Sequence, residues 1–119
     1  MASAAEVNFD QVKTASEDGS SVILDVRNPD EFAAGHIPSA VNVPLGELQE
    51  ALGLAADKFQ EKYKAALPGK EAAVICHCKM GGRAAKGCDV MKEAGFTNVQ
   101  IYKGSFMDWT EKGGQVVKE

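Results

Sequence analysis

Short apolar runs alternate along the chain with segments whose apolar residues follow helical spacing. Residues 21–25, 41–43, 73–77 and 99–101 are short runs rich in Val and Ile, which predict strands. Between two of these runs, Leu45, Leu48 and Leu52 have the spacing of one face of a helix. Short strands that alternate with helices over brief connections favour an α/β fold, with a mostly parallel sheet of about five strands covered by helices on both faces.

Capping residues predict where helices begin and end. Capping pairs are found at Asn8 with Gln11, Asn28 with Glu31, Asp57 with Gln60, and Ser105 with Asp108, and helix ends at Gly19, Gly35 and Gly95. The helix after Asp57 is expected to bury Phe59, Tyr63 and Ala66, and the last helix to place Trp109 in the core. We expect a single domain spanning residues 1–119, with residues 113–119 as a frayed tail.

Residues 73–94 predict a buried strand, a tight loop and a helix, with Cys78 at the bend. The helix is indicated by a small apolar face made of Ala84, Gly87, Cys88 and Met91. The loop runs Lys79-Met80-Gly81-Gly82-Arg83, and its paired glycines allow successive N–H groups to turn inward and hold an anion. The following helix adds unpaired N–H groups and the positive end of its dipole. We therefore expect the pKa of the Cys78 thiol to be lowered, so that it is a nucleophilic thiolate.

Composition narrows the choice of partners and of compartment. The 119 residues are 45% hydrophobic, enough for one compact core, and the formal net charge is −4 without any basic stripe. Nucleic acid and anionic membranes are therefore unexpected partners. The N-terminus lacks the features of a secretory signal or of a typical mitochondrial presequence, which favours a cytoplasmic protein with three reduced cysteines. Without a long exposed apolar stripe, we expect a monomer.

Several other polar residues lie where they could support Cys78. Asp25 and Arg27 follow the strand 21–25, at the sheet edge where ligands of parallel sheets bind. We interpret them as an ion pair or backbone anchor that supports Cys78 from a second layer. Arg83 has two interpretations, contact with a substrate anion and pairing with a carboxylate. Met80, at the loop tip, is a candidate apolar contact for an acceptor.

The run Cys76-His77-Cys78 raises the question of a metal site. A structural zinc site needs about four convergent ligands, and only His36 and Cys88 remain to complete one, so we expect neither a metal nor another cofactor. Cys76 and Cys88 are instead interpreted as core residues, His77 as a side chain that alternates off the strand, and His36 as a turn residue hydrogen-bonded to neighbouring backbone.

Four motifs in order make the chain resemble a single-domain rhodanese, a member of the thiosulfate sulfurtransferase family. They are Asp-Val-Arg at 25–27, a stretch at 31–44 that contains Gly-His-Ile-Pro, Cys-Lys-Met-Gly-Gly-Arg at 78–83, and Gly-Phe-Thr-Asn-Val at 95–99 followed by Tyr-Lys-Gly-Ser-Phe-Met-Asp-Trp at 102–109. The resemblance covers nearly the whole chain and implies a rhodanese-like fold.

The resemblance also implies a mechanism. The Cys78 thiolate would take the outer sulfur of thiosulfate, release sulfite and carry a persulfide until glutathione, another thiol or cyanide removes the sulfur. The N–H groups of the loop 79–83 would stabilise the anionic persulfide, and Lys79 and Arg83 would attract the donor dianion. Gly81 and Gly82 shape this binding loop. By resemblance, glutathione is the leading acceptor.

Two other kinds of function fit parts of the same pattern. Phosphatases and arsenate reductases also bind oxyanions in a cysteine loop that ends in arginine, but their loop is one residue longer than the four residues between Cys78 and Arg83. The wider ring suits a tetrahedral oxyanion, and the shorter one suits a single sulfur atom. A persulfide carrier or binding module that hands sulfur to a protein partner would use the same first step, and the sequence leaves it open.

Overall fold

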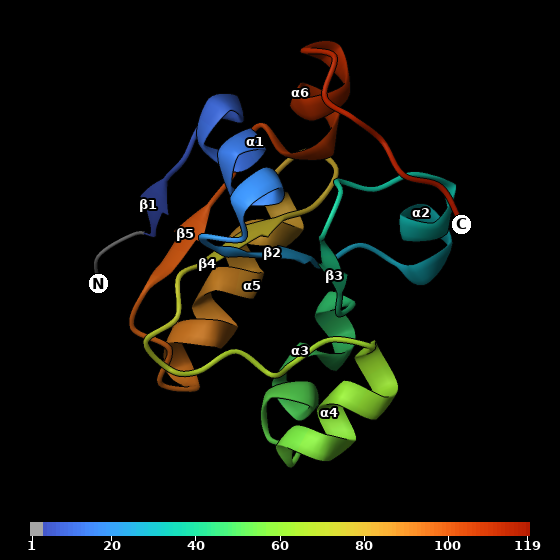
Figure 1. The fold of residues 1–119 in the computed structure, drawn as a ribbon. Helices are drawn as coiled ribbons and strands as arrows, with labels where there is room; N and C mark the ends of the chain where they lie inside the picture. The colour runs from blue at the N-terminus through green and yellow to red at the C-terminus, as the bar shows by residue number, and fades with distance from the viewer. Residues whose placement is uncertain (1–3) are drawn as a thin grey trace.

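The computed structural model describes residues 4–119, whose strands form one parallel sheet (Figure 1). The strands are β1 (Ala5–Glu6), β2 (Val22–Asp25), β3 (Val41–Asn42), β4 (Val74–His77) and β5 (Val99–Ile101), in the spatial order β1-β5-β4-β2-β3. Every neighbouring pair is parallel, so the carboxyl ends of β2 and β4 meet at one edge, where Asp25 lies beside His77. This confirms the predicted α/β architecture.

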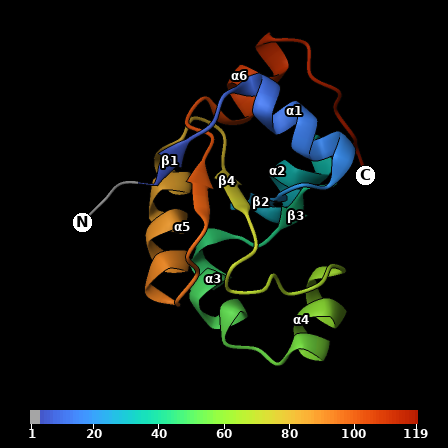
Figure 2. The ribbon, with the colours of Figure 1, turned by 60° about the vertical axis from the view of Figure 1, so that its left-hand side comes forward.

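Helices cover both faces of the sheet because successive strand residues point to opposite sides. The helices are α1 (Phe9–Asp18), α2 (Pro29–Ala34), α3 (Leu45–Leu52), α4 (Ala56–Tyr63), α5 (Gly82–Glu93) and α6 (Ser105–Glu111). Leu24 and Cys76 belong to the core beneath α3, α4 and α5, whereas Ile23 and Ile75 belong to the core beneath α1 and α6 (Figure 2). No helix within residues 4–119 is both long and apolar enough to cross a bilayer.

Local signals placed most of the helix boundaries correctly. Asn8 forms a capping box with Gln11, and Gly19 ends α1 in the left-handed conformation with φ of 71°. The Asn28 N–H donates to Glu31 Oε1 at the start of α2, over 3.2 Å. On α5 the buried residues are the four predicted ones: Ala84, Gly87, Cys88 and Met91.

Two predicted caps are wrong. Helix α4 begins at Ala56, before Asp57, and its N-cap Ala55 offers no side-chain acceptor, so burial of Phe59 rather than a cap fixes this helix. Tyr63 is only partly buried, and Ala66 lies beyond the helix and is exposed. The N-cap of α6 is Gly104, while Ser105 lies inside the helix and is fully buried.

The segment 113–119, which we expected to be frayed, folds back onto the protein. His36 and Val117 form an antiparallel bridge with two N–H···O bonds of 2.9 Å. The indole N–H of Trp109 donates to the Gln115 carbonyl over 2.8 Å, and the Glu119 N–H donates to the Ala33 carbonyl over 3.0 Å. These hydrogen bonds tie the tail to α2 and α6. The two glycines at 113 and 114 suggested a frayed tail because they give no local sign of these distant contacts.

Candidate active site

The predicted nucleophile Cys78 follows β4 at the carboxyl edge of the sheet. Its side chain is recessed, with 2% of the residue exposed. The Gly81 N–H donates to Cys78 Sγ over 3.0 Å. Burial would raise the pKa of this thiol, but the N–H groups of Ala84, Gly81 and Met80, with the Ser105 hydroxyl, lower it below its usual value. The arrangement favours a thiolate, as the loop sequence predicted.

The loop needs glycine at position 81 for two reasons. Gly81 has φ of 104°, a conformation that other residues rarely adopt. A Cβ at this position would also lie 2.6 Å from the Lys103 carbonyl oxygen. Gly82, by contrast, opens α5 and has free space where a Cβ would be. The close approach to Lys103 folds the loop tightly enough for the Gly81 N–H to reach the sulfur.

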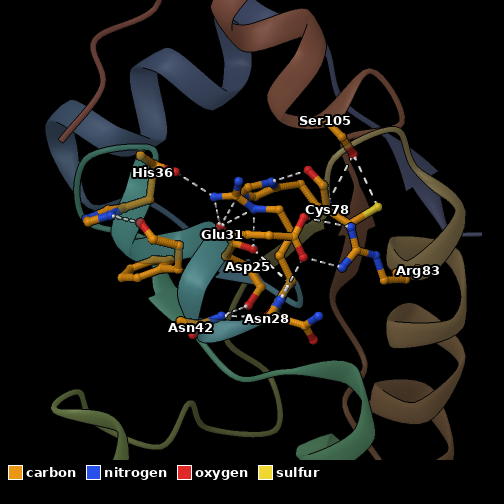
Figure 3. A network of polar contacts seen from close by, with 12 residues as sticks. Asp25, Asn28, Glu31, His36, Asn42, Cys78, Arg83 and Ser105 are labelled. Atoms are coloured by element: carbon orange, nitrogen blue, oxygen red, sulfur yellow. Dashed lines mark hydrogen bonds and ion pairs between the residues drawn. The ribbon is translucent and has the colours of Figure 1, made fainter. Parts of the chain in front are cut away.

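Ser105 is a site residue that the sequence analysis missed, since its pattern with Asp108 was interpreted as a helix cap. Its hydroxyl accepts the Cys78 N–H over 3.1 Å and lies 3.9 Å from Cys78 Sγ (Figure 3). Its backbone has φ of 59°, which costs a non-glycine residue about 1–2 kcal/mol. The only sequence signal was its place in the motif 102–109.

Arg83 forms a bidentate ion pair with Glu31, which reaches it from α2 (Figure 3). The guanidinium donates to the two carboxylate oxygens over 2.8 and 3.1 Å. Hydrogen bonds from Arg83 lower the pKa of Glu31 to about 2. Of the two interpretations of Arg83, the structure therefore shows pairing with a carboxylate. That carboxylate belongs to Glu31, for which the sequence pattern indicated only a capping role. Lys79 and Met80 are exposed at the loop tip, Met80 by 67%.

Asp25 and Arg27 form the buried ion pair that the sequence predicted. Arg27 donates to Asp25 Oδ2 over 2.7 Å and to the Gly35 carbonyl over 2.8 Å, which fixes the turn after α2. The Arg27 guanidinium also lies over the Phe106 ring, 4.3 Å from its centroid. Because the Phe106 N–H donates to the Cys78 carbonyl over 2.9 Å, the ion pair is linked to the nucleophile through this one residue.

The remaining histidines and cysteines lie in structural surroundings. His77 is fully buried, with Nδ1 3.1 Å from the Cys78 carbonyl oxygen, and burial lowers its pKa. Its Nε2 has no hydrogen-bond partner among residues 4–119 and lies 3.8 Å from Asp25 Oδ2. His36 Nδ1 lies 2.9 Å from the Phe32 carbonyl oxygen, as expected for a turn residue. Cys76, Cys88 and Trp109 are buried core residues, as predicted. Residues 4–119 contain no cluster of three His, Cys, Asp or Glu side chains suited to a metal.

Comparison with known proteins supports the family resemblance that the four sequence motifs indicated. The model of the rhodanese-like domain family matches residues 8–112. A human thiosulfate:glutathione sulfurtransferase is 34% identical over 113 residues, which cover 94% of this chain and 98% of that protein. The thiosulfate sulfurtransferase RDL2, mitochondrial, of Saccharomyces cerevisiae is 33% identical, covering 92% of this chain and 75% of its own. The solved structure of the human single-domain sulfurtransferase TSTD1 superimposes with a TM-score of 0.87 at 33% identity, over 92% of this chain and 97% of that one.

Proposed function

Because the chain belongs to the rhodanese-like domain family, we propose that it is a sulfurtransferase that moves sulfur from thiosulfate to a thiol acceptor through a persulfide on Cys78. The observation that carries this proposal is the recessed Cys78 sulfur, which accepts the Gly81 N–H and has a lowered pKa. A thiolate held by backbone donors is a ready nucleophile, and the same donors stabilise the negative charge of a persulfide.

The proposed reaction has two displacement steps. In the first, the Cys78 thiolate attacks the outer sulfur of thiosulfate, the S–S bond of the donor breaks with its electron pair on the leaving group, and sulfite departs. In the second, the thiolate of the acceptor attacks the outer sulfur of the Cys78 persulfide and regenerates the Cys78 thiolate. Charge is conserved in each step, and no metal, oxidant or reductant is needed.

The loop residues have separate roles in this scheme. Gly81 and Gly82 give the backbone its path, and Met80 offers an exposed apolar contact to the acceptor. Lys79 is the exposed cation that attracts the thiosulfate dianion. Arg83 shares its charge with Glu31, so we propose that it orients the loop as well as adding to the positive potential. Asp25 and Arg27 hold the Cys78 carbonyl in place through Phe106.

Thiosulfate and glutathione are our proposed substrates because both appear in the name of the human relative. A protein acceptor and a monomeric state stay predictions. The cytoplasmic location stays a prediction too, since the name of the yeast relative includes the word mitochondrial. The phosphatase alternative is disfavoured, because only four residues separate Cys78 from Arg83, and this shorter loop suits a single sulfur atom better than a tetrahedral oxyanion.

The test is sulfur loading followed by mass spectrometry. Thiosulfate should add one sulfur atom to the native protein, and the peptide that carries it should contain Cys78. Turnover with cyanide or glutathione should follow, and relative rates identify the preferred acceptor. Cys78→Ala should lose loading and reduce turnover about a thousandfold or more. Cys88→Ala is the matched control, because it removes a buried thiol outside the loop and should keep both activities. A native protein that never gains sulfur would contradict the proposal.

A further inference from the structure

Ser105 combines burial with a backbone conformation that serine rarely adopts. Three non-glycine residues within 4–119 have positive φ: Ser39, Lys64 and Ser105. The first two are exposed in turns or at a helix end, whereas Ser105 is completely buried. Glycine would adopt φ of 59° without strain, whereas serine is strained there. The strain of Ser105 therefore suggests that its hydroxyl has a role that glycine could not fill.

The Ser105 hydroxyl has one proton and two acceptors within reach. It donates to the Tyr102 carbonyl over 2.8 Å, and Cys78 Sγ is 3.9 Å away. At the same time it accepts the Cys78 N–H over 3.1 Å. Since a hydroxyl donates only one hydrogen bond at a time, the carbonyl and the sulfur compete for it. The Tyr102 carbonyl can release it at little cost, because it also accepts the Ser105 N–H over 3.1 Å.

We infer that Ser105 is a positioning residue for sulfur transfer. Its hydroxyl oxygen accepts the Cys78 N–H, and its hydroxyl proton turns from the Tyr102 carbonyl to the Cys78 sulfur whenever that sulfur is anionic. This inference rests on the proposed function, in which Cys78 is the reacting group. An anionic sulfur is a stronger acceptor than a neutral thiol or a carbonyl that already has a donor. The hydroxyl therefore stabilises the thiolate more than the thiol.

We expect the charged surroundings of Cys78 to stay the same when Ser105 is changed. The titratable and charged groups around it come from the loop, from α5, from α2 and from the ends of β2 and β4, namely Lys79, Arg83, Glu31, Asp25, Arg27 and His77. None of them has a hydrogen bond or ion pair with Ser105 among the contacts of residues 4–119. A change in the titration of Cys78 can thus be assigned to the lost hydroxyl.

Two substitutions separate the hydroxyl from the backbone strain. Ser105→Ala removes the hydroxyl and keeps a Cβ at positive φ, whereas Ser105→Gly removes the hydroxyl and relieves the strain. Thr110→Ala is the control, since it removes a hydroxyl from the same helix that bonds the Met107 carbonyl over 3.0 Å. The measurements are the melting temperature and the rate of Cys78 alkylation by iodoacetamide across pH, with the labelled cysteine identified by peptide mass.

Both Ser105 variants should shift the alkylation profile of Cys78 upward by about one pH unit, because each loses a hydrogen bond to a charged group. Ser105→Gly should have a higher melting temperature than Ser105→Ala and the same shifted profile. The inference is overturned if Ser105→Gly alkylates with the native profile, since relief of strain would then account for the position. Alkylation needs no thiosulfate, so this result is independent of whether the native protein loads sulfur.

Discussion

The ion pair between Glu31 and Arg83 reduces the positive charge of the loop that follows Cys78. Both side chains are partly exposed. Two parallel hydrogen bonds join them, so the guanidinium and the carboxylate neutralise each other's charge. Arg83 is therefore a cation with its counter-ion attached, and Lys79 is left as the more available charge for a dianionic donor. We therefore propose that Glu31 holds Arg83 in place and weakens its attraction for the donor.

Glu31→Gln tests this ion pair through the pH dependence of stability. Hydrogen bonds from Arg83 lower the pKa of Glu31 from 4.5 to about 2. A lowered folded-state pKa means that the stabilisation is complete above pH 4.5 and is lost as the pH falls toward 2. Because the pair is solvent-screened, we expect the variant to lose only about 1 kcal/mol at pH 7. Urea unfolding between pH 6 and pH 3 should show a steeper decline for the native protein than for the variant, and parallel declines would contradict the assignment.

The structure of the bend between β4 and α5 is determined both by local sequence and by contacts with residues distant in sequence. Its elements were predictable, because the apolar run before Cys78 and the small residues of α5 are local signals of strand and helix. The role of Ser105 was not predictable from its pattern with Asp108, because the same spacing describes a helix cap. What decides between the two is a contact with Cys78, 27 residues away in sequence.

A pair of neighbouring glycines tests the bend. Gly81→Ala should destabilise the protein by about 2 kcal/mol or more and raise the pKa of Cys78, because the new methyl group would meet the Lys103 carbonyl oxygen and displace the N–H that bonds the sulfur. Gly82→Ala has open space and a helical position, so its stability should stay within about 0.5 kcal/mol of native. Urea unfolding and the alkylation profile of Cys78 measure both effects, and equal losses in the two variants would exclude the proposed close approach.

Contacts between remote segments give the molecule the features that its sequence pattern could not predict. Arg83 meets Glu31 across 52 residues, and the tail 113–119 reaches back to α2 and to His36. The sequence pattern showed that both ion-pair partners are charged and that the tail is polar and rich in glycine, but pairing depends on how the layers stack. The complete burial of His77 depends on the same stacking, because helices cover both faces of the sheet.

Removal of residues 113–119 tests the packing of the tail onto the whole molecule. The truncated chain loses the acceptor of the Trp109 indole N–H and the antiparallel bridge to His36. Gly114 packs directly against the Trp109 ring, which leaves no room for a Cβ there, so the ring also loses its cover. We expect a loss of about 1–3 kcal/mol in urea unfolding. Emission from Trp109, the one tryptophan of the chain, should shift to longer wavelength.

Sulfur loading of the truncated chain should persist, because the contacts that hold Cys78 come from Gly81, Ser105 and Phe106 rather than from the tail. If the truncated chain unfolds at the native urea concentration with native emission, the tail does not pack in solution and the frayed tail expected from the sequence is correct. If stability is kept but loading is lost, the tail acts on the site through α2, whose Ala33 carbonyl it bonds and whose Glu31 holds Arg83.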